Sequence, residues 1–287
     1  NKKILITGHS GFKGYWLTQS LLFFGAKIHG VSHKIYNKNN FKGINTKNFI
    51  ETYKDLRKTN IEKLIKTFKP DIIFHLAAQS NLPLSYKEPF ESFDININTT
   101  LNILEALRKI DNATTSIFIT SDKAYKNLSF SRGYKESDEL GGKDPYSSSK
   151  ACSELIIQAY AHSYNLRIAS ARAGNVIGGN DFSNNRIFPD CMRYLYNKKK
   201  ILIRNPNATR PWQHVLDVIN GYLILGKYLY KNKKYTGSWN FGPNVDNNKT
   251  VKLLTQTILN KWGEGEILYI KNKVKEDKFL QLNSKKA

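Results

Sequence analysis

Thr7-Gly8-His9-Ser10-Gly11-Phe12-Lys13-Gly14 follows a short apolar segment and leads into an amphipathic one. The spacing G-x-x-G-x-x-G between a first strand and a first helix is typical of a dinucleotide-binding turn. Gly8 permits the tight turn, Gly11 lets the backbone approach a diphosphate, and Gly14 lets the helix pack on the strand. The helix start offers free N–H groups and the positive end of its dipole. We therefore predict that residues 8–14 bind a dinucleotide cofactor.

Strand-like and helical segments alternate along the first two thirds of the chain. The pattern predicts strands at 3–7, 27–31, 50–53, 71–76, 116–120 and 167–172, and helices at 15–24, 61–68, 93–110 and 145–164. This order is typical of an α/β, Rossmann-type doubly wound parallel sheet with helices on both faces. After Gly174 the order becomes less regular. We expect a dinucleotide-binding domain over 1–173 plus about 212–242, and a smaller substrate lobe over 174–211 plus 243–287.

The composition excludes several classes of protein. The chain has 287 residues and a net charge of +22. Its hydrophobic fraction of 40% is near that of a folded globular protein, despite the charge. It has no apolar run of about 18 residues, so no membrane span is predicted. Only nine of the 45 basic residues are Arg, and the lysines are spread without a nucleic-acid-binding motif. Because Cys152 and Cys191 are too few for a disulfide framework or a thiolate metal site, we expect a cytoplasmic setting and no metal.

Three further segments concern the cofactor. Val31-Ser32-His33-Lys34 lacks the acidic residue that binds the adenosine ribose of NAD, so this rule does not favour NAD over NADP. Asp55-Leu56 follows the third predicted strand and suits a contact with the adenine, although a solvated Asp is nearly as well supported. The small residues of His75-Leu76-Ala77-Ala78-Gln79 predict that the backbone lies close to the cofactor, through Ala77, Ala78 and Gln79.

Tyr146 and Lys150 are four residues apart, which places both on one face of a predicted helix. An ammonium group lowers the pKa of a neighbouring phenol, so that the phenolate can take a proton from a substrate hydroxyl while hydride leaves. The chain contains five Tyr-x-x-x-Lys pairs, and the other four lie in lysine-rich stretches typical of solvated faces. Only Tyr146 opens a helix that follows a strand with polar residues at its end. We predict that this pair is catalytic.

Ser121-Asp122-Lys123 stand at the end of the strand predicted over 116–120. The carboxyl ends of the strands are where a doubly wound sheet binds its ligands. Ser121 can hydrogen-bond the reacting hydroxyl, and Asp122 and Lys123 form a potential pair of acid and base. The structural alternative for polar residues at a strand end is a turn cap.

Together these segments resemble the extended short-chain dehydrogenase/reductase family. The resemblance covers nearly the whole chain and is closest to the CDP-glucose 4,6-dehydratase branch of nucleotide-sugar enzymes. The glycine motif and the Tyr/Lys pair occur throughout the superfamily, whereas the Ser-Asp-Lys trio, Ala-Gly-Asn-Val-Ile-Gly-Gly and Arg-Pro-Trp-Gln-His-Val are much narrower. The segments that carry it are 7–14, 75–79, 120–123, 144–150, 171–179, 204–206, 210–215 and 239–243.

The resemblance implies a tightly bound NAD and an internal redox cycle on a nucleotide diphosphate hexose, most closely CDP-glucose. Tyr146 would deprotonate the sugar 4-hydroxyl while hydride moves from C4 to the cofactor. The 4-ketone acidifies the C5 proton, which Lys123 would remove while Asp122 protonates the departing 6-hydroxyl. Return of hydride to C6 gives a 4-keto-6-deoxy sugar nucleotide. The alternative is a 4-epimerase or 4-reductase of the same superfamily, which needs no acid and base for elimination.

The resemblance also assigns binding residues. His214 is equally well explained by packing, and Arg172 by a structural ion pair. Guanidinium groups pair well with diphosphate oxygens, so arginines in a lysine-rich chain are informative. The implied residues are Asn96 for the cofactor, and Gln79, Ser121, Asn175, Arg186, Arg204, Arg210 and His214 for the substrate.

The resemblance sets expectations for partners and leaves one specificity open. Pro83 stands where the family usually carries an Arg, so the identity of the hexose stays undecided. The family continues beyond the last residue of this sequence, and a further C-terminal segment is expected. Homodimer formation through the helices predicted over 93–110 and 145–164 is also implied, as is a place in deoxysugar biosynthesis for lipopolysaccharide or capsule.

Overall fold

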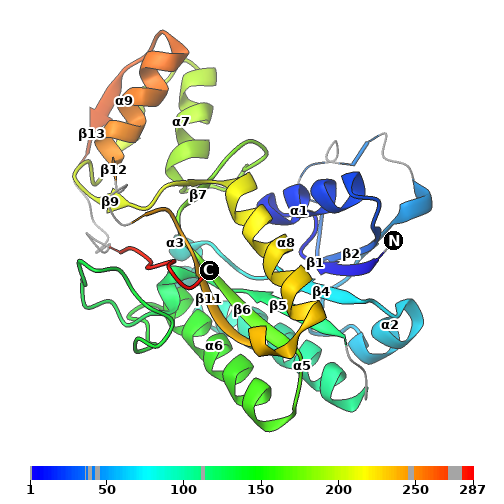
Figure 1. Ribbon diagram of the computed structural model, residues 1–287. Coiled ribbons are helices and arrows are strands. Elements are labelled where there is room, and N and C mark those ends of the chain that lie inside the picture. The colour runs from blue at the N-terminus through cyan, green and yellow to red at the C-terminus, as the bar shows by residue number, and fades with distance from the viewer. Residues whose placement is uncertain are drawn as a thin grey trace.

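The computed structural model describes residues 2–35, 37, 41–42, 46–110, 114–244, 249–270 and 280–287. Its centre is a seven-stranded parallel sheet of strand order β11-β6-β5-β4-β1-β2-β3 (Figure 1). The strands are β1 (Lys3–Thr7), β2 (Lys27–Ser32), β3 (Phe49–Tyr53), β4 (Ile72–His75), β5 (Thr115–Ile119), β6 (Ile168–Ala173) and β11 (Gly237–Phe241). The predicted Rossmann-type sheet is confirmed, and β11 adds a strand that the alternation pattern did not predict.

Helices cover both faces of the sheet (Figure 1). Apolar residues of α1 (Phe12–Phe23) and α8 (Val215–Lys231) pack on one face. Those of α2 (Ile61–Phe68), α5 (Thr99–Lys109) and α6 (Pro145–Ser163) pack on the other. Two apolar layers therefore hold the sheet rigid, which fixes the strand ends where ligands bind. Among the described helices, none combines the length and the apolar character that crossing a bilayer requires.

The helix predicted over 93–110 is interrupted. Short helices α3 (Leu82–Lys87) and α4 (Pro89–Phe93) come first, and a π-helical turn over Asp94–Asn98 precedes α5. Its sequence, Asp-Ile-Asn-Ile-Asn, alternates residues that are weak helix formers. The π-turn leaves Asn96 1% exposed, and such turns occur frequently at functional sites.

A smaller group of elements lies beyond the sheet (Figure 1). Helices α7 (Ile187–Tyr196) and α9 (Val251–Trp262) pack around a separate apolar core that includes Cys191 and Ile258. The short strands there are β8 (Ile201–Ile203), paired with β13 (Ile267–Tyr269), and β9 (Thr209–Arg210), paired with β12 (Lys249–Thr250). Strands β7 (Val176–Ile177) and β10 (Gln213–His214) pair next to the sheet. Of the predicted lobe, residues 245–248 and 271–279 lie outside the described residues.

Candidate active site

The glycine turn between β1 and α1 has the shape that a diphosphate requires. Gly8 has φ +77°, and a Cβ there would lie 2.6 Å from the Ala77 nitrogen. A Cβ on Gly14 would lie 2.0 Å from the Gly8 oxygen. Gly11 is the N-cap of α1, so the helix begins at Phe12, three residues earlier than predicted. The N–H groups of its first turn lack acceptors within the helix. These residues fit the diphosphate of a dinucleotide.

The side chains of His9 and Ser10 fasten this turn to the sheet. His9 is fully buried, with Nδ1 2.9 Å from Ser32 Oγ and Nε2 3.0 Å from Glu51 Oε1. Burial lowers the pKa of His9. Ser10 Oγ donates to the Lys34 carbonyl at 2.7 Å. Both side chains therefore hydrogen-bond to β2 and to neighbouring residues. The backbone of the turn remains available to bind a cofactor.

Asp55 is neither a free carboxylate nor simply solvated. Arg57 binds it through Nε and Nη2, the latter at 2.6 Å, and also lies 2.6 Å from Asp94 and 2.9 Å from Glu91. The hydrogen bonds from Arg57 lower the pKa of Asp55 to about 2. The neighbouring Leu56 is buried. Sequence analysis missed Arg57, although its spacing of two residues from Asp55 was a signal for this ion pair.

Asn96 joins the end of β4 to the catalytic helix. Its Oδ1 accepts from the Gln79 N–H at 2.9 Å, and its Nδ2 donates to the Gln79 carbonyl at 3.0 Å and to Ser149 Oγ at 2.8 Å. The Gln79 amide donates to Ser92 Oγ at 2.7 Å. Ala77 and Ala78 are partly buried beside the glycine turn. These contacts hold the residues predicted for the cofactor against α6.

Tyr146 and Lys150 occupy the first turns of α6, as predicted. An N-cap starts the helix there, since the Asp144 carboxylate accepts from the Ser147 N–H at 2.9 Å. Ser121, at the end of β5, hydrogen-bonds the Tyr146 hydroxyl. The structure therefore brings the predicted Ser/Tyr/Lys set together at the carboxyl end of the sheet.

Burial governs the ionisation of this set. It lowers the pKa of Lys150 to about 8, against the opposing charge of Glu154. Burial also raises the pKa of Tyr146, against the hydrogen bond with Ser121 and the charge of Arg186. The expected lowering of the phenol pKa is therefore not found, because the loss of solvation outweighs the nearby donors and cations.

Asp122 is a buried carboxyl with one unpaired oxygen. Its Oδ1 lies 3.0 Å from Ser121 Oγ, whereas Oδ2 has no hydrogen-bond partner among the described residues. A Cβ at Gly174 would lie 2.2 Å from this Oδ2, so only glycine leaves room for it. Burial raises the pKa of Asp122, opposed by the charge of Lys123 and the hydrogen bond from Ser121. The protonated form is thereby favoured, as a general acid requires. Sequence analysis did not foresee this role of Gly174.

Arg186 and Arg210, predicted for the substrate, act electrostatically on the catalytic residues. Arg186 donates to Ser80 Oγ at 3.0 Å and to Asp181 at 3.2 Å, and its charge lowers the pKa of Tyr146. Arg210 opposes the raised pKa of Asp122. The charges of these two predicted guanidinium groups thus favour the ionised forms of Tyr146 and Asp122.

The remaining substrate candidates lie around β7 and β10. Asn175 has a left-handed backbone, φ +41°, and its carbonyl accepts from the Gln213 N–H at 3.3 Å. Arg204 directly follows β8 and is partly buried. His214 is exposed and caps α8, with Nδ1 accepting from the Leu216 N–H at 3.3 Å. Helix capping, rather than packing in a core, is the structural role that the contacts of His214 define.

Arg172 forms a structural ion pair, which the sequence analysis gave as the alternative to a role in binding. It is fully buried, 2.7 Å from Glu154 and 2.6 Å from the Tyr125 hydroxyl. Ser170 Oγ and Thr120 Oγ1 also donate to Glu154. Glu154 was missed from sequence, although its position four residues after Lys150 places it on the same helix face.

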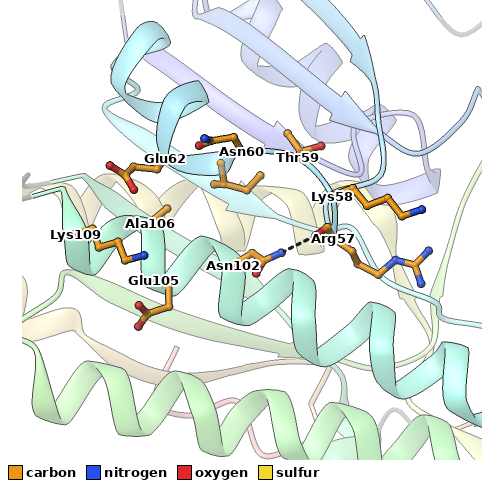
Figure 2. Close-up of a pocket in the computed structure, with 10 residues that line it drawn as sticks. Arg57, Lys58, Thr59, Asn60, Glu62, Asn102, Glu105, Ala106 and Lys109 are labelled. Carbon is orange, nitrogen blue, oxygen red and sulfur yellow. Dashed lines mark hydrogen bonds between the residues drawn. The ribbon is translucent and has the colours of Figure 1, made fainter.

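The surface hollow in Figure 2, of about 390 Å³, lies between α2 and α5. Charged and amide side chains line it, and Asn102 Nδ2 donates to the Arg57 carbonyl at 3.4 Å. None of the predicted catalytic or binding residues is among its lining residues, so we assign it no part in the site. Within the described ranges, no three His, Cys, Asp or Glu side chains gather in a way that would hold a metal ion.

A doubly wound sheet with a glycine cradle after its first strand and Ser, Tyr and Lys at its carboxyl end defines an extended short-chain dehydrogenase/reductase. The sequence model of the NAD dependent epimerase/dehydratase family matches residues 4–242. The chain belongs to this family. The family description names NAD, in agreement with the predicted cofactor.

Relatives with known activities cover the whole chain. CDP-glucose 4,6-dehydratase of Salmonella typhimurium is 37% identical over 100% of this chain and 84% of its own length. Among solved structures, UDP-N-acetylglucosamine 4-epimerase from Methanobrevibacter ruminantium has a TM-score of 0.88 at 22% identity, covering 100% of this chain and 90% of that one. The dTDP-glucose 4,6-dehydratase from Bacillus anthracis, solved with NAD, has a TM-score of 0.86 at 24% identity, covering 100% and 89%. At these identities the structures support the fold alone.

Proposed function

We propose that the protein is an NAD-dependent nucleotide-sugar 4,6-dehydratase whose preferred substrate is CDP-glucose. One observation carries the proposal, namely the buried Asp122 carboxyl with its unpaired Oδ2 beside Ser121. A simple 4-epimerase or 4-reductase has no need of a protonated acid at this place. The likeness to the CDP-glucose enzyme supports the choice of the base and the hexose.

The oxidation step begins at Tyr146. Ser121 holds the sugar 4-hydroxyl, and Tyr146 takes its proton as the phenolate. The hydrogen bond from Ser121 and the charge of Arg186 favour the phenolate, against the burial that raises the pKa of Tyr146. The backbone of residues 8–14 would hold NAD, which would supply the hydride chemistry at C4 and C6. Lys150, with a pKa of about 8, lies one helical turn from Tyr146 and supplies positive charge to the same site at neutral pH.

The elimination step belongs to Asp122 and Lys123. Once C4 is a ketone, the C5 proton is acidic enough for an amine base, and Lys123 takes it. Asp122 delivers its proton to the 6-hydroxyl, which leaves as water. Burial raises the pKa of Asp122 and so favours its protonated form, because the carboxylate form is poorly solvated.

The diphosphate of the substrate is held by arginines from the smaller lobe. We assign 174–211 plus 243–287 to that lobe and 1–173 plus about 212–242 to NAD binding. Arg186 and Arg210 reach the catalytic residues electrostatically, which supports their contact with the sugar diphosphate. The proposed set also includes Asn175, Arg204, Gln79 and the exposed His214.

Incubation with NAD and CDP-glucose tests the proposal. The expected product is CDP-4-keto-6-deoxyglucose, detected by mass loss of one water and by its alkali-dependent absorbance. dTDP-glucose, UDP-glucose and GDP-mannose serve as matched competitors for the base and the hexose. Recovery of CDP-glucose together with its C4 epimer, and no loss of water, would establish the epimerase alternative instead.

Homodimer formation through α6 and its neighbours is part of the proposal. Helices α3 and α4 pack against α6, and they carry exposed apolar side chains, Tyr86 at 52% and Phe90 at 81%, next to Leu155 of α6 at 55%. Size-exclusion chromatography with light scattering tests the dimer, and Leu155→Lys is expected to yield a monomer. We place the reaction in cytoplasmic deoxysugar synthesis for lipopolysaccharide or capsule.

A further inference from the structure

Lys13 extends from the glycine turn to a buried tyrosine. It is the second residue of α1, and its Nζ lies 3.5 Å from the Tyr222 hydroxyl and 5.8 Å from the centre of the Tyr222 ring. Tyr222 is fully buried on α8, which shares a face of the sheet with α1. Two helices that cover the same face therefore hold the Lys13 ammonium in place.

This pair also reaches the catalytic residues. The charges of Arg186 and Lys150 lower the pKa of Lys13, and that of Asp122 raises it. Burial is the largest influence, and the pKa of Lys13 falls to about 7. Burial and, to a lesser extent, the charge of the Tyr146 phenolate raise the pKa of Tyr222. Lys13, which belongs to the glycine turn, is therefore within electrostatic reach of Asp122, Lys150 and Arg186, and its partner Tyr222 is within reach of Tyr146.

We propose that Lys13, held by Tyr222, acts on the nicotinamide ring and weakens binding of its oxidised form relative to its reduced form. The inference rests on the proposed function, because hydride transfer requires the ring to approach the carbon whose hydroxyl Tyr146 deprotonates. The oxidised ring carries a positive charge and the reduced ring carries none, so a nearby ammonium repels only the oxidised form. Lys13 thereby strengthens the cofactor as a hydride acceptor.

A phosphate contact is the competing role for Lys13, and it makes a different prediction. The two forms of the cofactor carry the same diphosphate, which the backbone N–H groups of the turn already bind. A lysine that acted on the diphosphate would favour both forms equally. A lysine that acts on the ring changes the ratio of their dissociation constants.

The experiment measures Kd for NAD⁺ and for NADH, without sugar nucleotide, in wild type and Lys13→Met. At pH 6 the ratio Kd(NAD⁺)/Kd(NADH) is expected to be about tenfold lower in Lys13→Met, the equivalent of one pKa unit. In wild type the ratio should fall as pH rises from 6 to 7.5 and Lys13 loses its charge. The variant retains Asp122, Tyr146, Lys150 and Arg186, so their titration is common to both proteins and the difference isolates Lys13.

Two further variants complete the test. Tyr222→Phe should lower the ratio in the same direction but by less, since it removes only the hydroxyl partner. Lys27→Met removes one exposed positive charge and should leave the ratio unchanged. An equal loss of affinity for both forms, or an unchanged ratio, in Lys13→Met would overturn the inference. Because no sugar is present, this outcome is independent of whether CDP-glucose is converted.

Discussion

Two groups of buried ionisable residues in this protein differ in which form, charged or uncharged, their surroundings favour. Beneath the site, Arg172 and Glu154 pair at 2.7 Å, and hydroxyl groups surround them. Within the site, Asp122 and Lys150 are buried to a similar degree. Asp122 Oδ2 has no hydrogen-bond partner among the described residues, as is also true of Nε of Arg172 in the first group. Burial opposes every one of these charges.

The outcome depends on what faces the charge. The pKa of Glu154 is lowered, because Arg172 and several hydroxyl donors outweigh its burial. The pKa of Asp122 is raised and that of Lys150 is lowered, because burial prevails. Paired charges thus stabilise the fold. For the less well paired groups, burial shifts the pKa toward the uncharged form, as is common for groups that exchange protons. Changes to the first group should lower stability, and changes to the second should lower activity without lowering stability.

The largest effect is expected from breaking the paired group. Arg172→Met leaves Glu154 as a buried charge without its cation, so the free energy of unfolding should fall by about 3–5 kcal/mol. Urea denaturation followed by circular dichroism measures this change. Lys126→Met, which breaks the exposed pair of Lys126 and Glu139, is the control and should stay close to wild type. Equal stability of the two variants would refute the role given to Arg172.

Asp122→Asn tests the other group with the next largest effect. Asparagine keeps the shape but cannot deliver a proton, so turnover of CDP-glucose should fall roughly 10²–10³-fold. Stability should be unchanged or slightly higher, because a buried ionisable group with an unpaired oxygen is removed. Steady-state assays and urea denaturation of the same preparation give both values. A destabilisation like that of Arg172→Met would place Asp122 with the structural charges.

Lys150→Met is expected to stabilise the protein while abolishing activity. The pKa of Lys150 is about 8 in the folded state and 10.5 for a solvated lysine, so below pH 8 the buried ammonium destabilises the fold. The gain should be about 3 kcal/mol at pH 7 and should vanish as pH approaches 10.5. Wild-type stability accordingly rises from pH 8 to 10.5. A variant that is less stable than wild type at pH 7 would contradict the assignment.

The sequence predicted the sheet because the alternation of strands and helices is a local pattern. The glycine turn, the placing of Tyr146 and Lys150 on one helix and the position of Ser121 just after β5 are also readable within a few residues, whereas the catalytic role of these residues stays a prediction. Arg57 and Glu154 were missed because their partners are identified only by side-chain contacts across several elements. The π-turn at Asn96 was missed as well, since a helical period does not register one extra residue per turn.

The smallest effect concerns the cap that starts the catalytic helix. Asp144 accepts from the Ser147 N–H at 2.9 Å and from the Ser147 hydroxyl at 2.6 Å, so hydrogen bonds hold its carboxylate, without a cation like the one that Arg172 gives Glu154. Asp144→Ala should lower the free energy of unfolding by about 1 kcal/mol, whereas Asp144→Asn, which can still cap, should lose only part of this. Because Tyr146 is the second residue of α6, a frayed first turn should also lower kcat a few-fold with little change in KM. Urea denaturation and steady-state kinetics on both variants separate the two effects. Asp144→Ala could instead lose activity as severely as Asp122→Asn at unchanged stability. Asp144 would then act in the chemistry and not in the fold, and the division of the charged residues into structural and catalytic groups would be wrong for α6.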